Sequence, residues 1–281
     1  MLKDVTLGQF FPGNSVLHRA DPRMKIILAM AYIILVFAAR TTIAYMLVVA
    51  FTLLTVAVSR LNPIVVLKAL KPVLFIMVFT AVFNIFFYRG EGAPLVSIPV
   101  FKWSIDIYAK GIVNAVLMVV RVACVITGSC VILTYTTSPI ALTDGLERLL
   151  APLKRIHLPV HEFSMMMTIA LRFIPTLIEE TDKIMNAQKA RGADFSSGGL
   201  IKRAKALIPV LIPLFASSFR RAGELATAME CRCYRGDKGR TRMTKLHYTK
   251  LDFILLLCII VFGAGLVVLN ITTANILTFG V

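Results

Sequence analysis

Acidic residues and tryptophan are scarce in this sequence. There are 15 Asp and Glu against 31 Lys and Arg, and one Trp among 281 residues, whereas 58% of the residues are hydrophobic and the mean hydropathy is +0.80. A soluble domain of this length has no core large enough to hide so many apolar side chains. The composition therefore excludes a soluble globular protein and indicates an integral membrane protein.

The shortage of acidic residues leaves a formal charge of +16. A basic surplus can indicate nucleic-acid binding, but beside long apolar runs it is typical of the Lys and Arg residues that flank membrane spans on the cytoplasmic side. We therefore expect membrane lipid around the chain and no nucleic-acid partner.

Cysteine provides neither a disulfide framework nor a complete metal site. Cys124, Cys130 and Cys258 lie in apolar segments, where Cys is usually a small packing residue. Cys231 and Cys233 could form half of a metal site, but no His or Cys pair stands at the spacing that would complete it. We expect no metal site in this chain.

Motifs of catalysis and nucleotide binding are also missing. The sequence has no Gly-x4-Gly-Lys-Ser/Thr loop, no His-Glu-x-x-His helix and no Gly-x-Ser-x-Gly turn. We therefore expect no catalytic residues and no cofactor bound by this chain.

Apolar runs predict about five membrane spans, at residues 24–39, 43–58, 73–88, 111–135 and 251–269. Asp21 and Pro22 are suited to the cap and first position of the first helix, and the polar residues 1–21 do not resemble a cleaved signal peptide. The third helix is expected to begin near residue 65, with Pro72 close to its start. Residues 89–110 hold Gly, Pro and Trp103 and are expected as an external loop.

A long interruption, residues 138–250, separates the fourth and fifth spans. Its pattern predicts three amphipathic helices, beginning near Ser138, His161 and Leu200. The predicted fold is therefore an all-α integral membrane protein with a cytoplasmic helical domain, divided at residues 1–135, 136–250 and 251–281. Basic residues flank the first, third and last spans on the side of the interruption, so the N-terminus and the interruption are expected in the cytoplasm.

Arg121 stands inside the predicted fourth span. An arginine at that depth needs a partner or water, because a lone charge in lipid costs several kcal/mol. We favour a structural hydrogen bond to a neighbouring helix over a role in transport, since the sequence offers no chain of acidic residues to relay charge.

Two similar triplets end the second and third amphipathic helices: Ala190-Arg191-Gly192 and Cys231-Arg232-Cys233. Small neighbours let a partner approach the backbone closely, and a guanidinium is a planar set of donors for carboxylates. The alternative is structural: each Arg complements a helix dipole and Gly192 ends its helix, which explains the first triplet better than the second.

Several segments together resemble the transmembrane T component (EcfT, CbiQ-like superfamily) of energy-coupling factor transporters. They are His18-Arg19-Ala20-Asp21-Pro22-Arg23, Thr137-Ser138-Pro139, Leu146-Glu147-Arg148-Leu149-Leu150-Ala151-Pro152-Leu153, Ala170-Leu171-Arg172-Phe173-Ile174-Pro175, Gln188-Lys189-Ala190-Arg191-Gly192 and Ala228-Met229-Glu230-Cys231-Arg232-Cys233-Tyr234-Arg235-Gly236. The likeness covers almost the whole chain. Cysteines on both sides of Arg232 depart from the Ala-Arg-Gly that is usual in that family.

The resemblance implies a non-catalytic scaffold of an ABC importer for vitamins or micronutrients. Its two Arg-bearing helix ends would couple to two ATPase subunits, which bind ATP and Mg, and its membrane side would hold a substrate-binding S component. Met165, Met166 and Met167 are either core or an adaptable contact for the S component. Two alternatives remain: a T component dedicated to cobalt or nickel, and a membrane enzyme using Arg121, His157 and His161.

Overall fold

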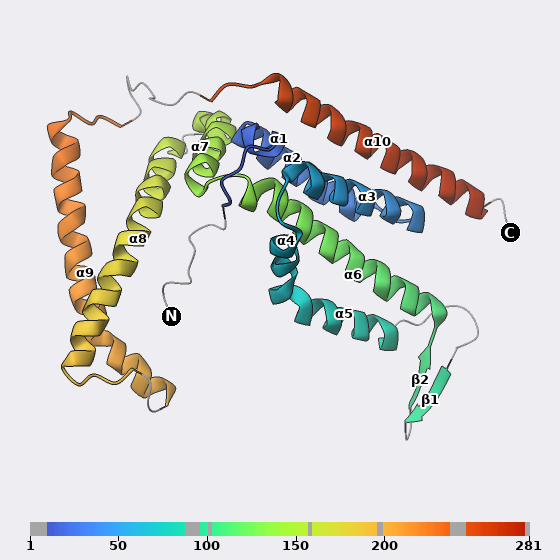
Figure 1. Cartoon of the computed structure of the whole chain (residues 1–281), viewed down its shortest axis with the longest axis horizontal. Coiled ribbons are helices and arrows are strands. Elements are labelled where there is room, and N and C mark those ends of the chain that lie inside the picture. The colour runs from blue at the N-terminus through green and yellow to red at the C-terminus, as the bar shows by residue number, and fades with distance from the viewer. Residues whose placement is uncertain are drawn as a thin grey trace. The chain divides into compact units, whose positions relative to one another are not determined.

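The computed structural model describes residues 10–87, 96–100, 103–156, 159–195, 199–236 and 246–278. The chain forms two compact units. The bundle unit comprises Gly8–Gly145 and Leu246–Val281, and the paired-helix unit comprises Met1–Leu7 and Leu146–Lys245. Helices make up most of both units (Figure 1), as the predicted all-α class requires. The predicted division at residues 1–135, 136–250 and 251–281 stays a prediction.

Most of the helices belong to the bundle unit. They are α1 (Val16–Arg19), α2 (Pro22–Ala38), α3 (Thr42–Ser59), α4 (Pro63–Leu70), a 3-10 turn (Lys71–Val73), α5 (Leu74–Phe87), α6 (Ala109–Ser129) with a π-helical end (Cys130–Tyr135), and α10 (Lys250–Thr278). The ranges long and apolar enough to cross a membrane are Thr42–Ser59, Pro63–Phe87, Ala109–Tyr135 and Lys250–Thr273. The remaining predicted span, α2, has 17 residues and is about 25 Å long.

The third predicted span is interrupted by a short turn. Pro72 lies in the 3-10 turn between α4 and α5, because proline has no N–H to donate within a helix. The predicted external connection before α6 contains a small antiparallel hairpin of β1 (Val96–Val100) and β2 (Trp103–Ile107). These strands are the exception to the helical architecture among the described residues.

Tyr32 lies at the centre of the bundle and joins three helices. Its side chain in α2 is fully buried, and its hydroxyl bonds Thr52 Oγ1 of α3 at 2.7 Å and donates to the Cys124 carbonyl of α6 at 2.9 Å. Gly128 makes room for the ring, since a Cβ at that position would lie 2.3 Å from Tyr32 Cε1. A close helix contact at a small residue is typical of packing within membranes.

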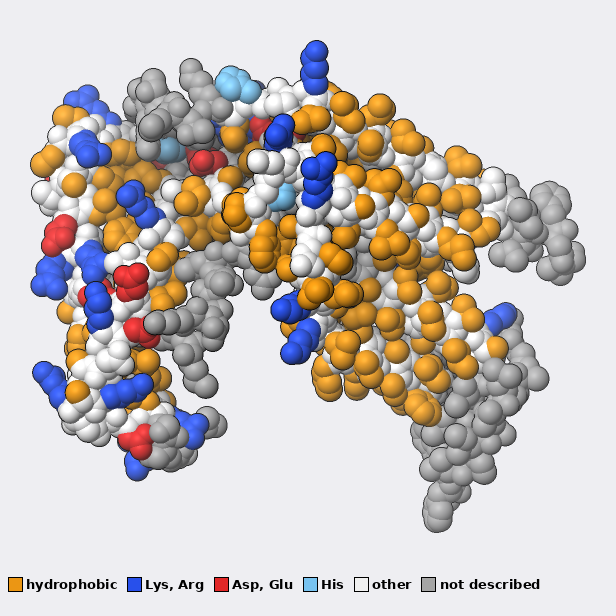
Figure 2. Space-filling view, viewed as in Figure 1, with side chains coloured by type: hydrophobic (Ala, Val, Ile, Leu, Met, Phe, Trp, Pro, Cys, Tyr) orange, Lys and Arg blue, Asp and Glu red, His pale blue; other side chains and the backbone are white. Residues whose placement is uncertain are grey.

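The outer surface of the bundle unit is strongly apolar. Figure 2 shows hydrophobic side chains over most of its described visible face. Phe75 of α5 is 78% exposed and Phe253 of α10 is 65% exposed, which is the arrangement expected when lipid rather than water surrounds the helices.

The paired-helix unit is built around two long helices, α8 (Val160–Ala190) and α9 (Leu200–Cys231). They follow α7 (Pro139–Leu150), whose last turn belongs to this unit, and a 3-10 segment (Ala151–Ile156). The Ser138 hydroxyl caps α7 by accepting from the Ala141 N–H at 3.2 Å, which confirms the predicted start of this helix near Ser138. In Figure 2, Lys, Arg, Asp and Glu side chains alternate with apolar ones along α8 and α9.

Candidate functional site: two arginine-bearing helix ends

The first predicted triplet forms the C-terminal end of α8. Arg191 is the C-cap, and Gly192 follows with a φ of 87°. The Gly192 N–H donates to the Lys189 carbonyl at 2.9 Å, and the Ala193 N–H donates to the Gln188 carbonyl at 3.0 Å. These paired bonds define a Schellman motif, in which glycine adopts a left-handed conformation at no steric cost.

The second triplet ends α9 in the same way. Arg232 is the C-cap, the Cys233 N–H donates to the Glu230 carbonyl at 2.8 Å, and the Tyr234 N–H donates to the Met229 carbonyl at 3.1 Å. Cys233 therefore occupies the position that Gly192 has in α8, with a φ of 54°. A residue with a Cβ is strained in this region by about 1 kcal/mol, so the departure from glycine does not change the type of turn.

The two arginines match in backbone conformation as well. Arg191 has φ −87° and ψ 9°, and Arg232 has φ −89° and ψ 13°. Both side chains are exposed, and within the described part of the chain neither guanidinium has a hydrogen bond or an ion pair. The helix-ending role thus explains the backbone of both triplets equally well, and leaves both guanidinium groups available to a partner.

The triplets lie at opposite ends of an antiparallel pair. Near the end of α8, Gln188 Nε2 lies 3.5 Å from the carbonyl of Pro209, in the first third of α9. Near the start of α8, Glu162 Oε1 lies 3.8 Å from the position that a Cβ on Gly236 would occupy, just after α9. Since α8 has 31 residues, the pair extends for about 45 Å, and the two ends can serve separate binding partners.

A polar cluster joins the middle of the two helices. Glu180 of α8 accepts a 2.5 Å hydrogen bond from the Ser217 hydroxyl of α9 and forms a 2.6 Å ion pair with Arg221. Glu180 was not among the candidate residues that the sequence indicated. The missed signal was the spacing of Ser217 and Arg221, four residues apart and thus on one face of α9.

The predicted methionine contact lies near the start of α8. Met166 is 61% exposed and Met167 is 39% exposed, whereas Met165 is half-buried. Phe163 beside them is 50% exposed. Met166 and Met167 are therefore not core residues of this chain by itself, and their contact with an S component stays a prediction.

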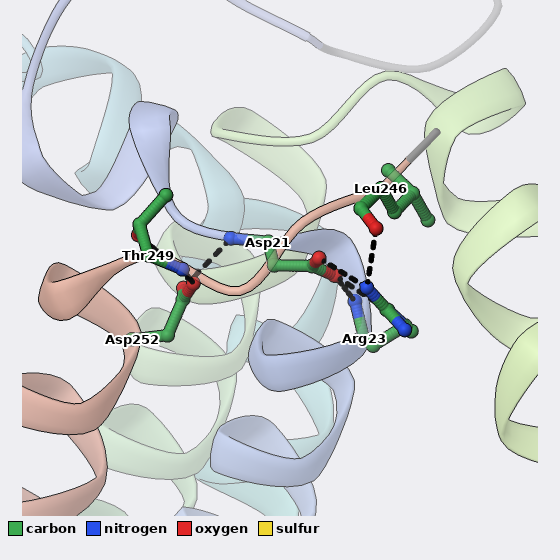
Figure 3. Close-up of polar contacts among 5 residues, drawn as sticks. All are labelled: Asp21, Arg23, Leu246, Thr249 and Asp252. Carbon is green, nitrogen blue, oxygen red and sulfur yellow. Dashed lines mark hydrogen bonds and ion pairs between the residues drawn. The ribbon is translucent and has the colours of Figure 1, made fainter. Parts of the chain in front are cut away.

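A second polar cluster, in the bundle unit, ties together the starts of α2 and α10 (Figure 3). Asp21 caps α2 by accepting from the Arg23 N–H at 2.9 Å, which confirms its predicted role, and also forms a 2.8 Å ion pair with the Arg23 guanidinium. Arg23 further donates to the Leu246 carbonyl at 3.1 Å. Asp252 accepts from the Thr249 N–H at 2.7 Å and from the Asp21 N–H at 2.8 Å.

The sequence contained a signal for this second cluster. Thr249 and Asp252 have the spacing of a capping box, in which an acidic side chain three residues after the cap bonds the N–H of the cap residue. Asp252 was not among the candidate residues that the sequence indicated, and its contact with Asp21, 231 positions away, could not be read from the sequence.

Arg121 has the structural role that the sequence favoured. Its Nη2 donates to the Ala39 carbonyl at 3.0 Å and to the hydroxyl of Tyr45. Asn270 donates to the neighbouring Ala38 carbonyl at 2.9 Å. The last carbonyls of α2 are thus bonded from α6 and α10, as the end of a short helix at membrane depth requires.

The residues of the enzyme alternative are divided between the two units and the part of the chain outside the described residues. Arg121 belongs to the bundle unit, whereas His161 belongs to the paired-helix unit and lies 3.0 Å from Glu147. His157 lies outside the described residues. Within the described ranges, Cys231 and Cys233 are free and exposed, and three or more His, Cys, Asp or Glu residues do not gather at any one place.

Fold and site together define a polytopic helical membrane protein that carries a pair of long amphipathic helices between its spans. The sequence model of the family described as cobalt transport protein (CbiQ) matches residues 13–243. The chain belongs to this family, which includes the transmembrane component of energy-coupling factor transporters.

Curated relatives are similar over nearly their whole length. The energy-coupling factor transporter transmembrane protein EcfT of Ruminiclostridium cellulolyticum is 53% identical over 272 residues, which cover 96% of this chain and 98% of the relative. The protein of the same name from Clostridium kluyveri is 51% identical over 262 residues, 93% of this chain and 95% of the relative. The protein of the same name from Bacillus subtilis is 44% identical over 264 residues, which cover 94% of this chain and 97% of the relative. The chain is therefore a transporter subunit of the cell membrane.

Proposed function

We propose that this chain is the energy-coupling subunit of an ABC importer, and that Arg191 and Arg232 each bind one of two ATPase subunits. The observation that carries the proposal is the repeated helix end: two Schellman turns present an exposed arginine in the same backbone conformation, at opposite ends of one helix pair. An arginine that only complements a helix dipole does not require the same turn and the same backbone conformation at both helix ends.

The chemistry of the two ends fits a carboxylate-lined groove on each ATPase. The guanidinium supplies a planar fork of donors, and the small residues on either side, Ala190 and Gly192 or Cys231 and Cys233, leave the backbone accessible. ATP and Mg belong to the partner subunits in this proposal, and this chain transmits the movement of the ATPases through α8 and α9.

The S component is proposed to bind the exposed apolar residues of the paired-helix unit. Met166, Met167 and Phe163 supply adaptable apolar area on α8, and Phe215 and Phe219 of α9 are 61% and 75% exposed. Replacing Met165, Met166 and Met167 together by Leu tests this surface. Altered uptake of some substrates supports the contact, and unchanged uptake of every substrate rejects it.

We further propose that the N-terminus and the helix pair face the cytoplasm. Lys and Arg cluster beside the starts of α2, α5 and α10, and all three starts share one side when α2 counts as a span. This orientation brings both arginines to the compartment that contains ATP.

The transported substrate is proposed to be a vitamin or another micronutrient carried by a separate S component. Cobalt or nickel is the second candidate, because the matching family is described as a cobalt transport protein. Uptake assays with radiolabelled vitamins and with cobalt, each with the co-purifying subunits identified, distinguish the two. A self-sufficient membrane enzyme remains a less favoured third candidate, and catalysis by the purified chain alone would support it.

Reconstitution of the purified complex in vesicles tests the coupling itself. Arg191→Ala and Arg232→Ala should each reduce uptake, and the double variant should abolish it while the ATPases alone retain hydrolysis. Losing one buried arginine pair costs on the order of 2–5 kcal/mol at an interface, and Arg→Lys should restore only part of it. Full uptake by the double variant would reject the proposal.

A further inference from the structure

The bundle unit contains an apolar cavity of about 240 Å³ between α1, α2, α3, the π-helical end of α6, and α10. Its walls include Leu17, Leu28, Phe51, Val58, Ile132 and Ile259. Apolar cavities smaller than this hold hydrocarbon molecules and exclude water. The size and lining therefore suit a length of hydrocarbon chain.

The polar groups on the cavity wall are already satisfied. Lys25 lines the cavity with its stem, while its Nζ donates to the Thr136 carbonyl at 2.9 Å and to Thr137 Oγ1 at 3.2 Å. The Thr55 hydroxyl donates to the Phe51 carbonyl at 2.8 Å. Apart from the weakly polar thiol of Cys258, the described wall thus offers no free polar side chain to a water molecule or to a polar ligand, and burying an unpaired polar group there would be costly.

The cavity opens onto the apolar surface of the bundle. Leu54 of α3 and Ile254 of α10 line it and are 59% and 54% exposed. Because this surface faces lipid in a membrane protein, a lipid chain can enter the cavity from the bilayer.

Three cations mark one end of the elements that line the cavity. Arg19 is the last residue of α1, Arg60 directly follows α3, and Lys250 begins α10. All three side chains are exposed, and none has an acidic partner among the described residues. Asp252, the acidic residue closest in sequence to Lys250, is instead buried against the N–H groups of Asp21 and Thr249.

We propose that this cavity is a binding site for one acyl chain of an anionic phospholipid, whose headgroup lies among Arg19, Arg60 and Lys250. The apolar cavity accounts for the binding of an acyl chain. The unpaired cations at the same end of the lining helices account for the preference for a negatively charged headgroup. A basic residue near a membrane surface strengthens the attraction to anionic lipid by about fivefold.

The test uses the full chain in nanodiscs of equal phosphatidylglycerol and phosphatidylcholine, followed by detergent extraction and native mass spectrometry of the retained lipid. The expected result is one retained phospholipid with a preference for phosphatidylglycerol. The variant with Arg19→Gln, Arg60→Gln and Lys250→Gln should lower that preference at least tenfold while the lipid is still retained.

Filling the cavity should have a different effect. Cys258→Phe, at the cavity mouth, should abolish retention of both lipids, whereas Leu257→Phe, on the neighbouring exposed position of α10, should leave it unchanged. Val58→Phe on α3 serves as a second filling variant should Cys258→Phe fail to fold. Undiminished retention in a folded filling variant, or an unchanged lipid preference in the triple Gln variant, would overturn the proposal.

Discussion

The backbone N–H of Asp21 donates a 2.8 Å hydrogen bond to Oδ1 of Asp252, although the two residues lie 231 positions apart in the chain. Through this bond the start of α10 is attached to the start of α2 (Figure 3). The same carboxylate caps its own helix with its other oxygen, Oδ2, which accepts from the Thr249 N–H and hydroxyl. Asp252 therefore fixes where the last span begins relative to the first helices of the bundle.

Asp252→Asn should destabilise the bundle, because an amide has only one acceptor oxygen for two groups of donors. Its NH2 would face an N–H of either Asp21 or Thr249, leaving a buried donor without a partner at a cost of about 1–3 kcal/mol. Thermal unfolding of the purified chain in detergent measures the loss. Asp144→Asn, at a half-buried position of α7, is the matched control and should leave the melting temperature unchanged.

Alanine should have opposite effects at two helical glycines. Gly128→Ala forces the fully buried Tyr32 ring to move, and overpacking of this kind costs about 1–3 kcal/mol. Gly223→Ala adds a Cβ to α9 where no heavy atom lies within 4 Å, so it should stabilise that helix by about 1 kcal/mol. Thermal unfolding measures the change in stability of each variant, and hydrogen exchange shows whether the change lies in α6 or in α9. Equal tolerance at both positions would contradict the packing described for Tyr32.

Substitutions in the turns after α8 and α9 should change stability in opposite directions, because one introduces a Cβ at a positive φ and the other removes one. Gly192→Ala places a Cβ at a φ of 87°, and should cost about 1 kcal/mol. Cys233→Gly removes a Cβ at a φ of 54°, and should gain about 0.5–1 kcal/mol. Hydrogen exchange of the Ala193 and Tyr234 amides reports each turn, with faster exchange in the first variant and slower exchange in the second. Unchanged or faster exchange of the Tyr234 amide in Cys233→Gly would contradict strain at Cys233, and slower exchange of the Ala193 amide in Gly192→Ala would contradict the need for glycine in the first turn.

The cluster around Glu180 should hold α8 and α9 at a fixed spacing. Both side chains of the Glu180–Arg221 pair are partly exposed, 20% and 33%, so solvent screening limits their coupling to about 1 kcal/mol in a double-mutant cycle. Glu180→Gln should widen the distance distribution between spin labels near the two helix ends. The charge-swapped variant, Glu180→Arg with Arg221→Glu, should narrow the distance distribution again. If no variant alters the distribution, the cluster around Glu180 does not hold the two helices at a fixed spacing.

Local sequence signals predicted most helix positions correctly. Asp21 and Pro22 marked the start of α2, and Arg191 and Gly192 marked the end of α8. These features depend on residues close in sequence, because a cap or a turn is made within a few positions. Pro72 was expected within the start of one helix, but the chain forms a 3-10 turn there.

The features that sequence could not supply depend on contacts between distant residues. The Asp21–Asp252 bond, the Arg121–Ala39 bond and the Glu180–Ser217 bond each require knowing which helices are neighbours. Arg121 needed a partner on energetic grounds, but nothing in the sequence pointed to the end of α2. Likewise, the π-helical end of α6 at Cys130–Tyr135 has no local signal that separates it from an ordinary helix.

We propose that each arginine-bearing helix end binds its own ATPase subunit. Native mass spectrometry of the co-expressed, purified complex counts the ATPases bound to one copy of this chain. We expect two ATPases on the unaltered chain, one on Arg191→Ala, one on Arg232→Ala and none on the double variant. Two ATPases on either single variant, or the loss of both from one substitution, would contradict it.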